Sequence, residues 1–203
     1  MRNGEVVAFC DFAAGRDENV LAIRRGNVVR IKRAWVENDT MQAAREFVYL
    51  CKAEGLSASQ VWGDADGLGT VMIDAMAEMD FRINRFRSGQ AASTPEEYAN
   101  LIGEVWHVGA MEIESGRVNL DVLDPVTFKQ LSTRKSEWSE NGKLRVESKD
   151  KMRMEGRHSP DRGDALLGCI VCGSRLSGSM SAQDISAPAR SENAFATSHV
   201  GGF

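Results

Sequence analysis

The sequence predicts an α/β fold in which helices flank a mixed β-sheet, with a β-hairpin added near the C-terminus. Three short apolar segments, at residues 6–10, 20–23 and 28–31, indicate a meander of strands. A helical pattern, an apolar strand, a second helical pattern and a further strand follow, which is the element order of an α/β sheet. Two crossovers between parallel strands would cover both faces of that sheet.

Start and stop signals set the limits of the elements after the meander. The first helix should begin with Thr40 as its cap and stop before Gly55. The fourth strand should cover 60–63, a glycine-rich turn should lead into a helix over 69–79, and the fifth strand should cover 81–86.

The second half of the chain should contain three helices and a hairpin. Helices are expected from Pro95 to about Met111 and over 124–131. The Asn-Gly pair at 141–142 should form the tip of a hairpin whose strands cover 136–139 and 143–148. The last helix should start with Ser159 as N-cap and Pro160 in the first position, and should end near residue 172.

Composition indicates one soluble domain. At 203 residues the chain is long enough for one filled core, so we expect a domain over 1–173 and a flexible Ser/Ala/Gly-rich tail over 174–203. Four scattered cysteines and the lack of a signal peptide or apolar span predict a cytoplasmic protein without membrane contact. The net charge of −4 provides no global attraction to nucleic acid, so a polyanion would need a local patch or a metal.

Three aspartates lie where apolar elements end or begin. Asp11 closes the first strand, Asp64 follows the fourth, and Asp161 lies in the first turn of the last helix. If the first and fourth strands are neighbours, Asp11 and Asp64 meet at one sheet edge. Clustered carboxylates repel one another unless cations neutralise them, and hard divalent ions prefer oxygen ligands. Two such ions about 4 Å apart support phosphodiester hydrolysis, which is the chemistry of nucleases.

Three segments resemble the nuclease domain of the large terminase subunit of tailed bacteriophages, which belongs to the RNase H-like superfamily. The resemblance covers roughly residues 5–172 in order. It lies in the motifs VAFCDFAAGRD (7–17), GDADGLG (63–69), and LRVESKDKM (144–152) followed by SPDRGDAL (159–166).

The resemblance implies an RNase H-like sheet and two Mg²⁺ or Mn²⁺ ions. It implies Asp11, Asp64 and Asp161 as catalytic metal ligands and Asp164 as a further metal ligand, with His158 close to the same metals. The third acidic position varies between neighbouring residues in the family, so the resemblance leaves open whether Asp161 or Asp164 fills it. It also implies a metal-dependent endonuclease that cuts double-stranded viral DNA during genome packaging, together with the phage portal, the small terminase subunit and a packaging ATPase. No GxxxxGK[ST] motif occurs, so the sequence lacks the ATPase motor.

Several of the candidate site residues also have a simpler interpretation that does not involve a metal. The helix dipole alone favours Asp161 and Asp164 in a first helical turn. Asp66 and Asp17 are possible site neighbours, but both are typical turn residues. His158 is either a solvated residue before the helix or a group that binds phosphate or moves a proton.

Residues 129–157 contain nine Lys or Arg and five Asp or Glu, a local balance of +4. This segment is either a solvated hairpin or a surface for sequence-independent phosphate contacts. Lys149 and Lys151 should otherwise form only exposed pairs with neighbours such as Asp150 and Glu155. The predicted DNA-binding residues are Lys143, Arg145, Lys149 and Lys151.

Two other classes of function remain open. A Holliday-junction resolvase or an RNase H-type nuclease would share this fold and these carboxylates. A catalytically silent packaging-assembly module would share the fold without retaining metal ions. Cleavage assays on different nucleic acids, and metal binding, separate these classes.

Overall fold

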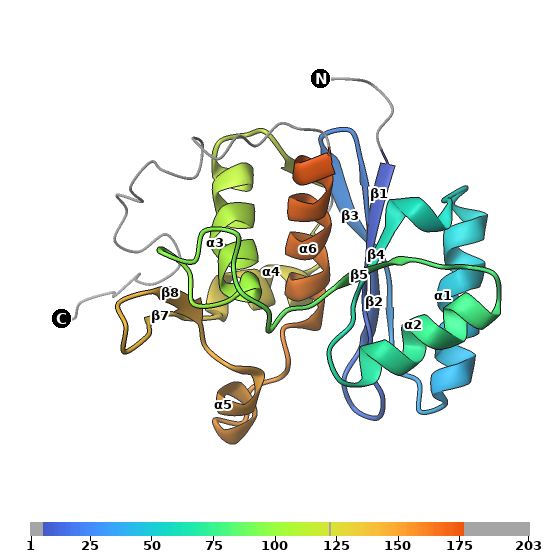
Figure 1. The fold of residues 1–203 in the computed structure, drawn as a ribbon, viewed down its shortest axis with the longest axis horizontal. Coiled ribbons are helices and arrows are strands. Elements are labelled where there is room, and N and C mark those ends of the chain that lie inside the picture. The colour runs from blue at the N-terminus through green and yellow to red at the C-terminus, as the bar shows by residue number, and fades with distance from the viewer. Residues whose placement is uncertain (1–5, 122, 177–203) are drawn as a thin grey trace.

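The computed structural model describes residues 6–121 and 123–176, which fold around a mixed β-sheet (Figure 1). Within that part of the chain, six strands lie in the order β5-β4-β1-β2-β3-β6. β1 pairs antiparallel with β2 and parallel with β4, and β4 pairs parallel with β5, so the sheet is mixed, as predicted. The strands are β1 (Val6–Asp11), β2 (Asn19–Arg25), β3 (Val28–Trp35), β4 (Val61–Asp64), β5 (Asn84–Phe86) and β6 (Asn119–Leu120).

Helices α1 (Thr40–Ala53) and α2 (Leu68–Glu78) cover one face of the sheet (Figure 1). Asp39 caps α1 by accepting hydrogen bonds from the backbone N–H groups of Met41 and Gln42. A short 3₁₀ turn, Ala58–Gln60, leads from α1 into β4. Phe47 and Met72 are fully buried in the core between these helices and the sheet.

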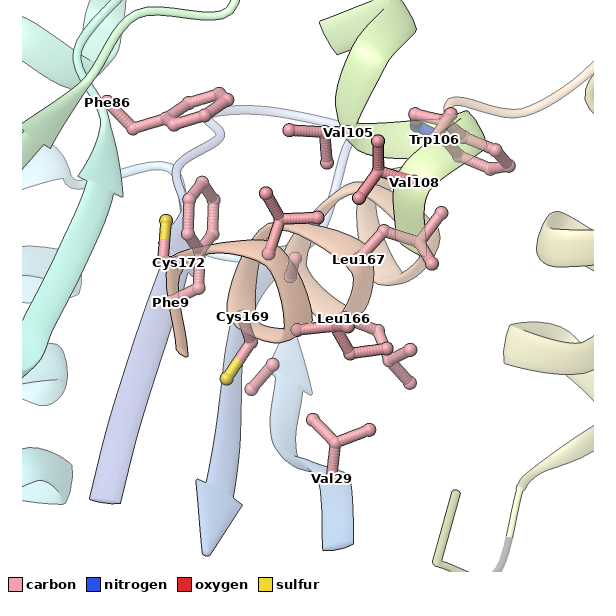
Figure 2. Close-up of a cluster of buried hydrophobic side chains, with 14 of the residues drawn as sticks. Phe9, Val29, Phe86, Val105, Trp106, Val108, Leu166, Leu167, Cys169 and Cys172 are labelled. Carbon is pink, nitrogen blue, oxygen red and sulfur yellow. The ribbon is translucent and has the colours of Figure 1, made fainter. Parts of the chain in front are cut away.

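Helix α6 (Asp161–Leu176) lies against the opposite face, with α3 (Leu101–Glu114) and α4 (Pro125–Thr133) packed beside it. Figure 2 shows the core on this side, where side chains of α6 lie between those of the sheet and α3. The Cys169 thiol donates to the Val7 carbonyl oxygen at 3.4 Å. All four cysteines are free and buried.

Strand alternation decides which side chains reach each core. Val7 and Phe9 of β1 belong to the core beneath α6, whereas Ala8 and Cys10 belong to the core beneath α1 and α2. Successive strand residues point to opposite faces, so Asp11 lies on the α6 face together with Phe9.

A β-hairpin and a short helix lie beyond the main sheet (Figure 1). The hairpin consists of β7 (Ser136–Trp138) and β8 (Leu144–Val146), with Trp138 paired to Leu144. This confirms the hairpin predicted from the Asn-Gly pair. Helix α5 (Lys149–Met154) follows at once, capped by the Ser148 side chain, where the sequence analysis placed no helix.

Helix α3 begins at Leu101, six residues later than predicted from Pro95. The preceding residues instead pair with the hairpin: Ala99 donates to the Leu144 carbonyl oxygen at 2.8 Å, and Leu144 donates to that of Glu97 at 2.7 Å. The Asn100 side chain then accepts from the Gly103 N–H and caps α3. Backbone pairing to a distant segment therefore overrides the local helical pattern.

Helix α6 starts at Asp161, after both Ser159 and Pro160, and continues to Leu176. It is longer than predicted because Ser174 is buried against Arg24, whose guanidinium donates to the Ser174 hydroxyl at 2.7 Å. The rest of the predicted tail, from residue 177, lies outside the described residues. No helix in the described ranges is long and apolar enough to cross a membrane.

Candidate active site

Asp11 and Asp64 lie at the carboxyl ends of two neighbouring parallel strands. Cys10 of β1 is in register with Gly63 of β4, so the next residues along the two strands are Asp11 and Asp64. Trp62 packs against the core beneath α6, and Asp64, two residues further on, lies on the same face. Register and alternation therefore place both carboxylates at one sheet edge on the α6 side.

The turn after β4 needs its glycines for a steric reason. Gly67 has a φ of +53°, a conformation that side chains rarely adopt. A Cβ atom on Gly69 would overlap the carbonyl oxygen of Asp64. The GDADGLG motif thus lets α2 begin directly against the residue that bears a site carboxylate.

Asp66 anchors a loop. Its carboxylate accepts hydrogen bonds from the Ser88 hydroxyl and the Gly89 N–H, both at 2.8 Å. Its own N–H donates to Asp64 Oδ1 at 3.2 Å. Asp66 therefore supports the position of Asp64 and ties the loop after β5 to the site.

Asp161 and Asp164 come from the first turn of α6 and are both buried. The Ser159 hydroxyl donates to Asp161 Oδ1, and the Glu18 N–H donates to Asp161 Oδ2 at 3.2 Å. Residues three apart on a helix share a face, so both carboxylates point toward the end of β1.

The ammonium of Lys149 lies among these carboxylates. Its Nζ atom is 3.3 Å from Asp11 Oδ2, 3.1 Å from Asp161 Oδ1 and 3.0 Å from Asp164 Oδ2. The three acids raise the pKa of Lys149 well above its usual value, although burial opposes this. The sequence analysis expected Lys149 to pair at most with exposed neighbours; this was wrong, because α5 directs it into the site.

Asp164 has two further partners that the sequence analysis did not assign. Its Oδ1 atom accepts from the indole Nε1 of Trp106 and from the Arg134 guanidinium, both at 2.6 Å. The Arg134 guanidinium also lies over the Trp106 ring, 4.7 Å from its centroid. Neither residue is in a recognisable motif, so nothing in the sequence marked them as parts of the site.

The pKa values of the four aspartates are not all shifted in the same direction. Burial raises the pKa of Asp11 well above its usual value despite Lys149, and the charges of Asp161, Asp164 and Asp64 raise it further. Burial also raises the pKa of Asp161 and of Asp64. Burial acts in the same sense on Asp164, but Arg134 and Lys149 outweigh it and lower the pKa of that carboxyl.

A buried ion pair holds the segment that carries Lys149. The Glu147 side chain is completely buried and pairs with the Arg157 guanidinium. It also accepts from the Lys135 N–H at 2.8 Å, while the Glu147 carbonyl oxygen accepts from Arg134 at 3.1 and 3.2 Å. Glu147 thereby connects the hairpin to Arg134 and fixes the start of α5.

A groove of about 410 Å³ opens beside the carboxylates. Asp64 and Asp164 line this groove together with Lys149, Lys151 and Arg145. Lys143 is not among the lining residues; its N–H donates to the Ser139 hydroxyl in the hairpin. Three of the four predicted DNA-binding residues therefore share one groove.

Asp17 and His158, which were predicted as possible site neighbours, have no contact with the four carboxylates among the interactions of the described residues. Asp17 forms an ion pair with Arg153 at 2.7 Å and so links the β1–β2 turn to α5. His158 is exposed.

The carboxylates surround one cation, the Lys149 ammonium, and could also surround a metal ion. In the described part of the chain, no three acidic, histidine or cysteine side chains are already arranged as a metal site. The place among the carboxylates is taken by the Lys149 ammonium. The acids nevertheless outnumber the cations, with Asp11, Asp64, Asp161 and Asp164 beside Lys149 and Arg134. Hard oxygen ligands with excess negative charge are the donor set of Mg²⁺ or Mn²⁺.

Comparison with solved structures identifies the architecture, although no family model and no curated protein sequence matches the chain. A mutant of the nuclease domain of the large terminase subunit gp2 of bacterial virus Sf6, with manganese and β-thujaplicinol, superposes with a TM-score of 0.74. The two share 20% identity over 84% of this chain and 89% of that one. This chain has the fold of a large terminase nuclease domain. The predicted RNase H-like fold is thereby confirmed.

Two further phage proteins show the same likeness. The large terminase nuclease of phage G20c with bound magnesium has a TM-score of 0.63 at 12% identity, over 84% of this chain and 82% of that one. The large terminase nuclease domain of Thermus phage P74-26 has a TM-score of 0.54 at 14% identity, over 81% and 77%. The terminase nuclease fold is thus kept at very low sequence identity.

Proposed function

We propose that this protein is a metal-dependent endonuclease that cuts double-stranded DNA during viral genome packaging. The observation that carries the proposal is the convergence of four carboxylates from β1, β4 and α6 beside a groove with basic side chains. The terminase nuclease fold supports the same assignment, since the Sf6 and G20c nucleases bear manganese and magnesium.

Asp11, Asp64 and Asp161 would hold the metal, with Asp164 beside them. Two Mg²⁺ or Mn²⁺ ions bound here would polarise the scissile phosphate and activate water for in-line attack. The residues fit this role because they offer oxygen ligands with excess negative charge, in a buried place that already accommodates a cation.

Arg134 and Trp106 keep Asp164 ionised and fix its orientation. Their two hydrogen bonds reach the same oxygen, Oδ1, and leave Oδ2 directed at Lys149. Because Arg134 also bonds the Glu147 carbonyl oxygen, Asp164 is held rigidly against the hairpin segment. Asp164 therefore positions the Lys149 ammonium and completes the negative charge of the site.

Lys149 has two roles in this scheme. Without metal, its ammonium neutralises Asp11, Asp161 and Asp164 and keeps the cluster folded. If the carboxylates held a divalent ion instead, the flexible Lys149 side chain would be released from these pairs and could turn toward the groove, which it already lines. There it would contact a DNA phosphate next to the cleaved bond.

The groove would bind duplex DNA through its backbone, because the predicted DNA contacts are cations that recognise phosphate without reading bases. Such a nuclease would act with a packaging ATPase, the portal and the small terminase subunit, which would deliver the DNA. We propose these partners on the terminase nuclease fold alone.

Plasmid cleavage in Mn²⁺, Mg²⁺ and EDTA tests the proposal, alongside calorimetric titration of Mn²⁺ into wild type and Asp11→Asn. We expect nicking and linearisation in either metal, no cleavage in EDTA, and weaker Mn²⁺ binding by Asp11→Asn. A wild type that binds no Mn²⁺ and leaves the plasmid intact would be a silent assembly module. Preferential cutting of four-way junctions or RNA–DNA hybrids over linear duplex would assign it to the resolvases or RNases H.

A further inference from the structure

One acidic side chain lies in the proposed DNA groove among the cations that should bind phosphate. Glu137 of β7 pairs with Lys151 of α5 and, at 3.3 Å, with Arg145 of β8. All three residues line the groove that leads to Asp64 and Asp164. A carboxylate in this position holds two of the predicted phosphate contacts.

The hairpin geometry explains why Glu137 takes both partners. Glu137 and Arg145 are directly opposite each other in the antiparallel ladder, so their side chains project from the same face. Lys151 is the third residue of α5, and the Ser148 cap fixes the start of that helix. The Glu137 side chain is 20% exposed, whereas those of Lys151 and Arg145 are 44% and 49% exposed. The Glu137 carboxylate is therefore the most buried of the three groups, and the two cations are more exposed to solvent.

We propose that Glu137 is an intramolecular competitor of DNA phosphate, which restrains binding at the nuclease groove by occupying Lys151 and Arg145. The inference rests on the proposed function, because it assumes that the groove binds DNA. A phosphate that reaches either cation must break its pair with Glu137 and leave that carboxylate beside the DNA backbone. Binding is weakened by the lost pair and by the repulsion.

This arrangement suits a nuclease that must not cut whenever DNA is near. Exposed ion pairs are worth little, so a phosphate backbone held close by other means would displace Glu137 readily. A free duplex in solution would instead meet a groove whose cations are already paired. Glu137 would thus favour DNA that is presented to the groove over DNA that merely diffuses past.

The test compares Glu137→Gln with Glu140→Gln by fluorescence anisotropy on a labelled 20-base-pair duplex in EDTA, over a series of salt concentrations. Glu140 is an exposed residue of the same hairpin and does not line the groove, so its substitution changes the net charge equally. We expect Glu137→Gln to tighten binding about tenfold at low salt and to steepen the slope of log affinity against log salt by about 0.9 to 1.8. Glu140→Gln should have a much smaller effect.

A second pair of variants tests whether Glu137 acts through its two partners. In a Lys151→Gln/Arg145→Gln background, Glu137→Gln should give no more tightening than Glu140→Gln. If it tightens binding fully there, or if both glutamates act equally in the wild-type background, the effect is general repulsion and the inference is wrong. Weaker binding by Glu137→Gln would make Glu137 a positioning residue for the cations and would also overturn it.

The outcome also distinguishes the inference from the proposed function. A wild type that binds duplex with a negative salt slope, but whose affinity Glu137→Gln does not increase, refutes only the competitor role. If neither the wild type nor Glu137→Gln binds duplex at low salt, the DNA-binding function itself fails.

Discussion

Lys149 and Asp11 form an ion pair of 3.3 Å although they are 138 residues apart in the sequence. The lysine comes from the start of α5, and the aspartate ends the central strand β1. Through this pair, and those with Asp161 and Asp164, one ammonium joins β1 and α6, which are two of the three segments that carry the proposed metal ligands. The contact places a cation among the proposed metal ligands and yields the first prediction.

Lys149→Met should destabilise the protein in the absence of metal and increase its affinity for divalent ions. Removing the ammonium leaves buried carboxylates to repel one another, which should cost about 2 kcal/mol and lower Tm by about 4–8 °C. Divalent ions then bind without displacing an ammonium, so calorimetry should show Mn²⁺ affinity about tenfold higher. Lys151→Met, which removes a cation from the same helix but from outside the cluster, is the control. Equal Mn²⁺ affinity in wild type and Lys149→Met would contradict the displacement.

Asp11→Asn and Asp164→Asn should shift stability in opposite directions. The raised pKa of Asp11 means that its charge opposes folding at pH 7, so removing that charge should leave Tm unchanged or raise it. The lowered pKa of Asp164 means that its charge stabilises the fold. Asp164→Asn leaves Arg134 buried beside a neutral group, which should cost about 3 kcal/mol.

Thermal melts in EDTA at pH 7 measure this difference, and plasmid cleavage supplies the second readout. Asp11→Asn should lose about 100-fold or more in cleavage rate, because metal binding supplies several kcal/mol to the reaction. A strongly destabilised Asp11→Asn would contradict the conclusion that the Asp11 charge opposes folding. An Asp164→Asn as stable as wild type would contradict the conclusion that the Asp164 charge stabilises the fold.

Glu147→Gln should lower the stability of the protein at neutral pH and have little effect on it in acid. The Arg157 hydrogen bond lowers the pKa of Glu147 from its ordinary value of 4.5, so its charge stabilises the fold above that value. The contribution is lost as pH falls through the lowered, folded-state pKa. We expect a loss of about 2 kcal/mol at pH 7, and a smaller difference from wild type below about pH 4.

Urea unfolding at both pH values checks this. Glu155→Gln is the matched control, because Glu155 pairs with the same arginine but its side chain is 40% exposed. It should change the free energy of unfolding by less than about 1 kcal/mol. A pH-independent loss in Glu147→Gln would show that packing, and not charge, holds the segment before Lys149.

Two truncations should separate the end of α6 from the residues that follow it. Deleting 179–203 keeps the whole of α6 and should leave Tm and plasmid cleavage unchanged. Ending the chain after Gly173 removes the Ser174 hydroxyl, which accepts a hydrogen bond from the buried Arg24 guanidinium at 2.7 Å. That loss should cost about 1–3 kcal/mol. A large drop in Tm from the shorter deletion would show that the residues after α6 contribute to the folded domain.

Local patterns predicted the strand meander, the first two helices and the hairpin, because these depend on periodicity and turn residues. Crossover rules allowed β1 and β4 to be neighbours, and the structure pairs them. Local patterns also predicted that Asp11 and Asp64 lie at the ends of the first and fourth strands. They failed where a distant segment competes, as in the residues before α3 that pair with Leu144 instead of forming a helix. Helix α5 was missed because its six residues are too few to show a period.

The sequence by itself determined which acidic residues would be available at the sheet edge and on α6. Only the tertiary structure decided that Lys149 lies among them, that Trp106 and Arg134 hold Asp164, and that Glu137 faces the groove cations. Strand alternation and helix phase are local properties and can be read along the chain. The partners of a buried charge depend instead on which remote elements pack together, because burial makes a neutralising contact necessary without specifying which residue supplies it.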